Sequence, residues 1–260
     1  MTGRAVRVLS PALGWIVAAA FVGVWEVAAR TLNLRFLSTF SATALAAVRL
    51  VTGASLMTHV LPSLGRVLAG YAIGAAVGIV FGLLLGNASS LEGWFRPVLE
   101  FLRALPPPLI LPLAMVILGV NTPMQVFVIA FGCCWPVLLN ALDGARRVDP
   151  QYLETARACR TPHSVLLWRV VLPASLPQIF AGLRTALGLA LILMVISEMV
   201  ASYAGLGYLI LYDQRTFKVA DMYGAVLIIG LIGWLLSLIF RQTEQLALSW
   251  HIQRQGDMHV

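Results

Sequence analysis

The chain has 260 residues, of which 60% are hydrophobic and only 11% are charged, and its mean hydropathy is +0.88. A soluble domain is nearer half apolar and a quarter charged, so this composition excludes an ordinary soluble protein and predicts an all-α, polytopic membrane protein. The net charge of +7 comes almost wholly from arginine, which we attribute to cytoplasmic loops and not to a nucleic-acid partner. We expect residues 1–260 to form a single transmembrane domain.

The first apolar run predicts a membrane span over residues 11–29. A span needs about 20 apolar residues to cross roughly 30 Å of hydrocarbon. Arg4 and Arg7 precede the run, as they would in a signal peptide, but no small-residue cleavage site with a soluble domain follows. We therefore expect a retained span, followed by a short surface helix over residues 41–51.

A second span is predicted over residues 64–86, and its glycines fall on every fourth position: Gly70, Gly74, Gly78, Gly82 and Gly86. On a helix this spacing forms one slowly drifting stripe. Because lipid provides little hydrophobic drive between helices, close backbone approach is what gains contact energy. The stripe therefore predicts tight packing against a neighbouring helix. The alternative is that glycine is simply frequent in membrane helices.

After a polar connection over residues 92–103, a long uncharged run fits two spans, over residues 104–119 and 123–142. The first of these begins with three prolines, which cannot lie in a regular helix interior: Pro106, Pro107 and Pro108. Irregular backbone at membrane depth is tolerated only inside protein or beside a water-filled cavity. The prolines are therefore candidates for the wall of a transport pathway. The alternative is an ordinary helix entrance near the headgroups.

One long polar segment, residues 143–175, interrupts the apolar chain. It holds two successive helix-start signals, Asp149 before Pro150 and Thr161 before Pro162. Two short helices with a sharp turn between them are therefore expected. Such a hairpin, held between membrane spans, suits docking against another protein, whereas the alternative is an ordinary solvated loop.

Three residues of the first short helix are spaced to share one apolar face that would suit a groove on a partner: Tyr152, Ala156 and Cys159. Glu154 is the best candidate for a polar contact with that partner. It could instead pair with Arg157 or Arg160 on its own helix, where an exposed pair contributes only about 0.3–0.5 kcal/mol.

The last two spans are predicted over residues 176–202 and 222–240. Glu198 lies deep in the first of them, and carboxylates at such depth usually face the bundle interior because a charge in lipid costs several kcal/mol. It could relay protons, contact substrate, or serve as a structural hydrogen-bonding group. Arg184, near the inner end of the same span, is explained by its side chain reaching toward water.

The distribution of basic residues predicts the orientation. With the N-terminus inside and six spans threaded, twelve of the 18 arginines and lysines lie on the cytoplasmic side. Both termini and the polar segment 143–175 are then cytoplasmic.

The sequence holds no phosphate-binding loop of the G-x-x-x-x-G-K-S/T type and no H-E-x-x-H or C-x-x-C pair. We therefore expect no catalytic residue, no metal site and no cofactor in this chain. The three cysteines have no disulfide or metal spacing and are interpreted as small hydrophobic side chains.

The polar segment resembles the EAA loop of bacterial ABC importer permeases, which reads E-A-A, three residues, G, nine residues, I-x-L-P. Glu154, Ala156, Leu172 and Pro173 match this pattern, and Val170 stands in for its isoleucine. Thr155 replaces the middle alanine, and Arg160 stands where the family has glycine. In the family this loop forms coupling helices that enter a groove on the ATPase subunit. Here the Thr161–Pro162 pair could enforce the turn that the glycine allows.

Further segments resemble the permeases of nitrate, sulfonate and taurine-type importers: the glycine-rich span, Leu102–Pro106, Gly182–Arg184, Ser197–Met199 and Gly205–Tyr208. The resemblance implies a type I, MetI-like permease of the bacterial inner membrane that pairs with a second copy of itself. It also implies two ATPase subunits that carry ATP and magnesium, and a periplasmic binding protein that delivers a small anion or related solute. In that case the coupling residues are Tyr152, Glu154, Ala156, Arg157, Cys159, Arg160 and Pro162.

A different class of function remains open at this point. A proton-coupled secondary transporter could use Glu198 as its proton carrier. That class usually has more spans and inverted repeats, and no convincing repeat relates the two halves of this sequence.

Overall fold

The computed structural model describes residues 3–32, 34–87 and 89–249, and within these ranges every regular element is a helix. The long helices are α1 (Gly3–Leu32), α3 (Leu61–Asn87), α4 (Ser89–Ala104), α6 (Thr122–Arg146), α9 (Leu172–Ala201) and α11 (Val219–Ala247). The shorter ones are α2 (Phe40–Thr52), α5 (Ile110–Leu118), α7 (Pro150–Ala158), α8 (His163–Leu166) and α10 (Leu206–Arg215). Single turns of other helix types occur at η1 (Leu56–Val60), η2 (Pro107–Leu109) and η3 (Leu167–Val171).

Five helical stretches of the described chain are long and apolar enough to cross a membrane: Leu13–Leu32, Leu56–Asn87, Thr122–Arg146, Ser164–Ala201 and Val219–Ala247. A sixth crossing is possible if the bent pair Pro97–Ala104 and Pro107–Leu118 counts as one span. The predicted all-α, polytopic architecture with about six spans is therefore confirmed.

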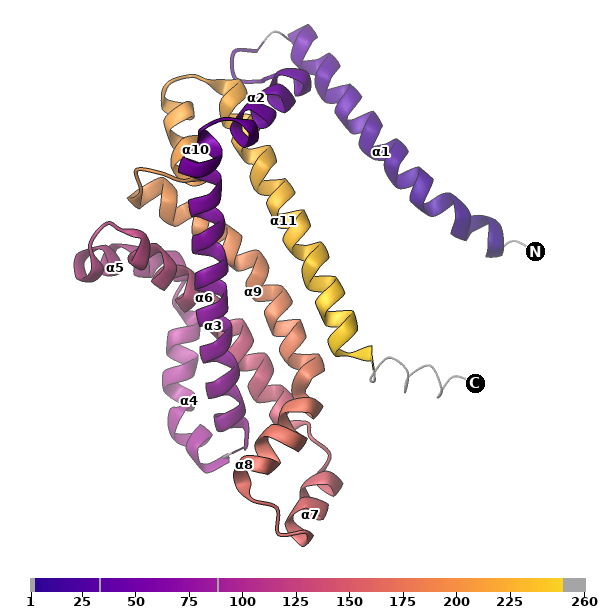
Figure 1. The fold of residues 1–260 in the computed structure, drawn as a ribbon, viewed down its shortest axis with the longest axis vertical. Helices are drawn as coiled ribbons and strands as arrows, with labels where there is room; N and C mark the ends of the chain where they lie inside the picture. The colour runs from indigo at the N-terminus through magenta and orange to yellow at the C-terminus, as the bar shows by residue number, and fades with distance from the viewer. Residues whose placement is uncertain (1–2, 33, 88, 250–260) are drawn as a thin grey trace.

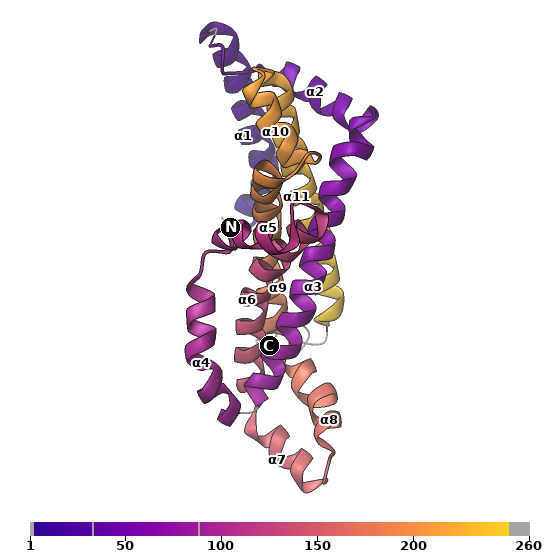
Figure 2. The ribbon, with the colours of Figure 1, turned by 90° about the vertical axis from the view of Figure 1, so that its left-hand side faces the viewer.

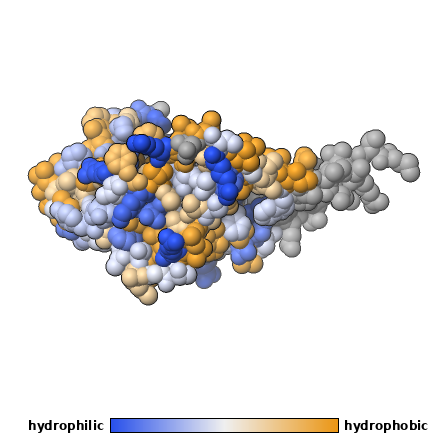
Figure 3. All heavy atoms as spheres, turned by 90° about the horizontal axis from the view of Figure 1, so that it is seen from above, coloured by the Kyte–Doolittle hydropathy of each residue, from blue (hydrophilic) through white to orange (hydrophobic). Residues whose placement is uncertain are grey.

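The long helices run roughly along the longest dimension of the molecule (Figure 1). Helices α2 and α10 lie at one end, and α7 and α8 extend beyond the spans at the other (Figures 1 and 2). Helix α1 leans away from the bundle. Figure 3 shows the molecule from the end that carries α2 and α10, where separate hydrophilic patches lie between apolar ones.

The core of the bundle is made by α3, α6 and α9. One of its buried clusters joins Val67 of α3, Ile129 and Cys133 of α6, and Ala190 and Leu193 of α9. The predicted glycine stripe lies at the contact between α3 and α6. A Cβ atom added at Gly74 would lie 2.5 Å from the Ala130 carbonyl oxygen. Each of the other four glycines would likewise meet backbone or side-chain atoms of α6 within 3.0 Å. The backbones thus approach as closely as the missing side chains allow.

The segment predicted as a third span over residues 104–119 does not form one continuous helix. Helix α4, which includes the segment expected to be a polar connection, ends at Ala104, and the chain then bends by 81° into η2 and α5. Pro106 has an extended backbone (ψ 124°), because a residue that precedes proline is pushed out of the helical region. As a result, α5 lies across the bundle about halfway along its length (Figure 2).

Replacing Gly74 with alanine should destabilise the bundle by about 1–3 kcal/mol, because the new methyl group meets the backbone of α6 and cannot be accommodated by a flexible side chain. The measurement is thermal unfolding of the purified protein in detergent. Gly65→Ala is the matched control on the same helix, since a Cβ atom there meets nothing within 4 Å. Equal melting temperatures for the two variants would show that close contact between α3 and α6 does not stabilise the fold.

Candidate functional site

The polar segment folds as the two short helices α7 and α8. The Asp149 carboxylate accepts a hydrogen bond from the Gln151 backbone N–H at 2.9 Å, which caps the start of α7. At the end of α7, the Thr161 N–H reaches back to the Ala156 carbonyl at 3.0 Å. Helix α8 begins after Pro162. The hairpin lies at one end of the molecule, beyond the long helices (Figures 1 and 2).

Arg160 has a positive φ of 51°, the left-handed conformation that ends many helices and that glycine adopts most easily. This is the position at which the EAA pattern has glycine. The turn therefore keeps the left-handed geometry expected of glycine although the residue is arginine. The Thr161–Pro162 pair acts after this turn and does not replace it.

The faces of α7 differ from the prediction. Ala156 is 9% exposed and packs with Ala145, Val148 and Leu166 of its own chain, so it does not share an exposed face with Tyr152 and Cys159. The reason is that the hairpin folds back onto the end of α6, which buries the inner side of α7. Five of the predicted coupling residues remain exposed, and we refer to them as the outward face of the hairpin: Tyr152, Glu154, Cys159, Arg160 and Pro162. The side chain of Arg157 lies outside the described part of the structure.

At the opposite end of the bundle, Glu198 is completely buried and forms an ion pair with Arg66. The Arg66 guanidinium donates to the carboxylate at 2.6 Å, and the Gly207 backbone N–H donates to it at 2.9 Å. The Ser63 hydroxyl lies 2.8 Å from both carboxylate oxygens. Every oxygen of this buried carboxylate therefore has a donor, as a charge in this environment requires.

The same cluster fixes the link between α9 and α10 onto the start of α3. Arg66 also donates to the Ala204 carbonyl at 2.9 Å, and the Gly205 N–H donates to the Nδ1 atom of His59 at 3.1 Å. Gly205 has a φ of 123°, and a Cβ atom there would lie 2.4 Å from the Glu198 carboxyl group. Glycine is required at this position both by its backbone conformation and by the space that the carboxylate occupies.

Sequence reasoning found Glu198 but missed its partners Ser63 and Arg66, and it missed His59, which accepts a hydrogen bond from the Gly205 N–H. Arg66 and Glu198 are 132 residues apart, so no local pattern connects them. One signal was available: Arg66 is the cation at the border of a glycine-rich span, and a buried carboxylate needs a counter-charge.

The three candidate pathway prolines lie at the bend between α4 and α5. Pro107 is half-buried and packs on α6, since a Cβ atom at Gly132 would lie 3.2 Å from it. Pro106 and Pro108 are exposed. The structure does not bring these prolines to Glu198, which is bonded to α3 and to the α9–α10 link.

Removing one member of the buried ion pair should cost about 3–5 kcal/mol, because the other charge is left without its partner. We expect Arg66→Met and Glu198→Gln each to lower the melting temperature strongly. The double variant should recover much of the loss, since it leaves no unpaired charge. A double variant as unstable as the sum of the two singles would mean that the residues act independently.

Replacing Arg160 with glycine should stabilise the hairpin by roughly 1 kcal/mol, because glycine adopts the left-handed conformation without the Cβ clash. Thermal unfolding measures the effect. Ala158→Gly, two residues earlier and still inside α7, should do the opposite and destabilise. If Arg160→Gly also destabilised, the left-handed turn would not describe the folded state.

The family model described as "Binding-protein-dependent transport system inner membrane component" matches residues 74–243. The bicarbonate transport system permease protein CmpB of Synechococcus elongatus is 38% identical over 182 residues, which are 70% of this chain and 66% of CmpB. The matched stretch is thus just under two thirds of that relative.

The putative aliphatic sulfonates transport permease protein SsuC of Bacillus subtilis is 28% identical over 245 residues, which are 94% of this chain and 89% of SsuC. Among solved structures, an inward-facing form of the MetNI methionine ABC transporter has a TM-score of 0.63 at 17% identity, covering 73% of this chain and 94% of that one. That likeness shows a shared fold. The family match over most of the chain shows that this protein belongs to the family of inner membrane components of binding-protein-dependent transport systems.

Proposed function

We propose that this chain is the membrane-spanning permease subunit of an ATP-driven importer. Two copies would form the pathway in the bacterial inner membrane, and a periplasmic binding protein would deliver the solute. ATP and magnesium would be bound by separate ATPase subunits on the cytoplasmic side, where both termini and the α7–α8 hairpin also lie. The chain itself would not be an enzyme.

The observation that carries this proposal is the geometry of the α7–α8 hairpin. It extends beyond the spans and exposes Tyr152, Glu154 and Cys159, while Ala156 anchors it in a cluster with Ala145 of α6 and Ile179 of α9. A partner that moves the exposed face would therefore displace two helices of the central bundle. This is what a coupling element between an ATPase and a pathway must do.

A small anion is the solute class that we favour. The relatives named above are a permease of a bicarbonate system and a putative permease for aliphatic sulfonates, and both of these substrates are oxyanions. The pathway would run beside the bend at Pro106–Pro108, where the extended backbone of Pro106 interrupts the helices about halfway along the molecule.

Proton-coupled transport by Glu198 is the less favoured function. A proton carrier must exchange with water, whereas Glu198 is fully buried and its oxygens accept bonds from Arg66, Ser63 and Gly207. These contacts are typical of an ion pair with a structural role. The family match points in the same direction.

Co-purification tests the proposal. A tagged wild-type chain should bring down an ATP-binding subunit, and Glu154→Lys should abolish or strongly reduce both this association and solute uptake, because it reverses the charge on the outward face of α7. Gln214→Lys, an exposed position on α10 at the opposite end, is the control and should leave both unchanged.

Full assembly and uptake in the Glu154→Lys variant would contradict the role given to the hairpin. Uptake that survives ATP depletion but collapses with a protonophore would contradict the proposed energy source and favour the use of Glu198.

A further inference from the structure

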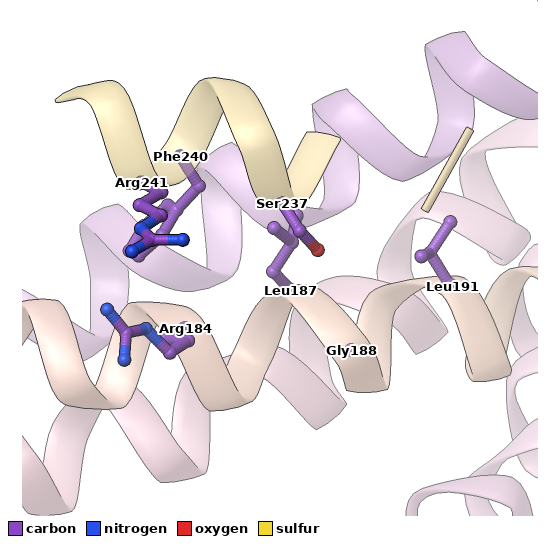
Figure 4. A pocket seen from close by; sticks show the side chains of 7 residues that line it. All are labelled: Arg184, Leu187, Gly188, Leu191, Ser237, Phe240 and Arg241. Carbon is purple, nitrogen blue, oxygen red and sulfur yellow. The ribbon is translucent and has the colours of Figure 1, made fainter. Parts of the chain in front are cut away.

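A cavity of about 480 Å³ lies between the middle of α9 and the last half of α11. The two helices are linked beside it by an ion pair between Arg184 and Glu244 and by the neighbouring rings of Phe180 and Phe240. Figure 4 shows Arg184 and Arg241 on facing helices at one end of the cavity. This is the end nearer the α7–α8 hairpin.

The mouth of the cavity carries one uncompensated positive charge. Glu244 offsets Arg184, whereas Arg241 has no ion-pair or hydrogen-bond partner among the described residues. Arg184 and Arg241 line the same cavity, where their positive charges repel each other, and a bound anion would relieve that repulsion.

A second cavity at the same end of the molecule, between α4 and α6, provides a comparison. It is lined by two carboxylates and two arginines, so its charges cancel: Glu100, Arg103, Asp143 and Arg146. Of these two cavities, only the one between α9 and α11 therefore has a net positive charge that an anion could neutralise.

Apart from Ser237, the rest of that cavity is apolar, and it runs along α9. Leu187, Gly188 and Leu191 follow Arg184 on α9, and the seven helical steps from Arg184 to Leu191 rise about 10 Å. A Cβ atom at Gly188 would meet nothing within 4 Å, so the groove is open at that point. The cavity thus combines a basic mouth with an apolar groove.

We propose that this cavity binds an anionic phospholipid, with its phosphate between Arg184 and Arg241 and one acyl chain along Gly188 and Leu191. A phosphodiester carries the single negative charge that the mouth lacks, and an acyl chain fills the groove that a small inorganic anion would leave empty. Large apolar side chains on α11 remain exposed near the cavity, including Leu238 and Ile239, which suits a border with lipid. The site is independent of the transport function proposed above.

The test is a lipid titration of the purified full-length chain in a non-ionic detergent. The probes are phosphatidylglycerol and phosphatidylcholine of the same chain length. We expect the wild-type chain to prefer phosphatidylglycerol. Arg241→Gln should weaken phosphatidylglycerol binding by about tenfold, as the loss of one charge-assisted hydrogen bond predicts, and should leave phosphatidylcholine binding unchanged.

Two further variants separate the parts of the site. Gly188→Leu fills the groove without changing the charge, and it should weaken phosphatidylglycerol binding while the melting temperature is retained. Arg49→Gln, an exposed arginine on α2, is the matched control and should bind as wild type does.

Three results would overturn the proposal. The first is equal affinity of the wild-type chain for the two lipids. The second is unchanged binding in both Arg241→Gln and Gly188→Leu. The third is displacement of phosphatidylglycerol by millimolar sulfate together with wild-type behaviour of Gly188→Leu, which would identify a site for a free oxyanion.

Discussion

Close contact between the α3 and α6 backbones is the constraint on which the rest of the structure depends. In a bilayer the tails of the lipid are as apolar as leucine, so a helix pair gains little from burying large side chains and much from approaching closely. The five glycines permit that approach over the part of α3 from Gly70 to Gly86. The paired helices then provide a rigid surface on which α9 packs, through Val67, Ile129 and Leu193. The α7–α8 hairpin and the Arg66–Glu198 ion pair are both built on this three-helix unit.

The two ends of α9 are held in different ways. At its C-terminal end, the Glu198 carboxylate is fixed by Arg66 and Ser63 of α3. Breaking this buried ion pair costs much more stability than the pair adds relative to two apolar side chains in its place. At its N-terminal end, Ile179 packs in an apolar cluster with Ala156 of the hairpin and Ala141 of α6. The polar end specifies one geometry because its hydrogen bonds are directional, whereas the apolar end can slide with less cost.

The sequence predicted those features that depend on local pattern. Glycine periodicity located the helix contact, and the Asp149–Pro150 and Thr161–Pro162 pairs located the two helices of the hairpin. Features that depend on distant residues were missed. The burial of Ala156 follows from how the hairpin folds back, and the Arg66–Glu198 pair joins residues far apart in the chain. The proline run was expected to be incompatible with a regular helix interior, but the 81° bend between α4 and α5 was not predicted, because hydrophobicity does not report the direction of the chain.

Arg160 shows how a departure from a family pattern can preserve its geometry. Glycine is favoured at the end of a helix because the left-handed region costs other residues roughly 1–2 kcal/mol. Arg160 adopts this conformation nevertheless, and the hydrogen bond from the Thr161 N–H to the Ala156 carbonyl closes the turn as it does at other helix ends. In return, the outward face of the hairpin gains a guanidinium group next to Cys159 and Pro162, where a glycine would offer only backbone. A side chain at a position that favours glycine is explained by a partner that contacts it, so Arg160 joins Glu154 among the exposed hairpin residues proposed to meet the ATPase.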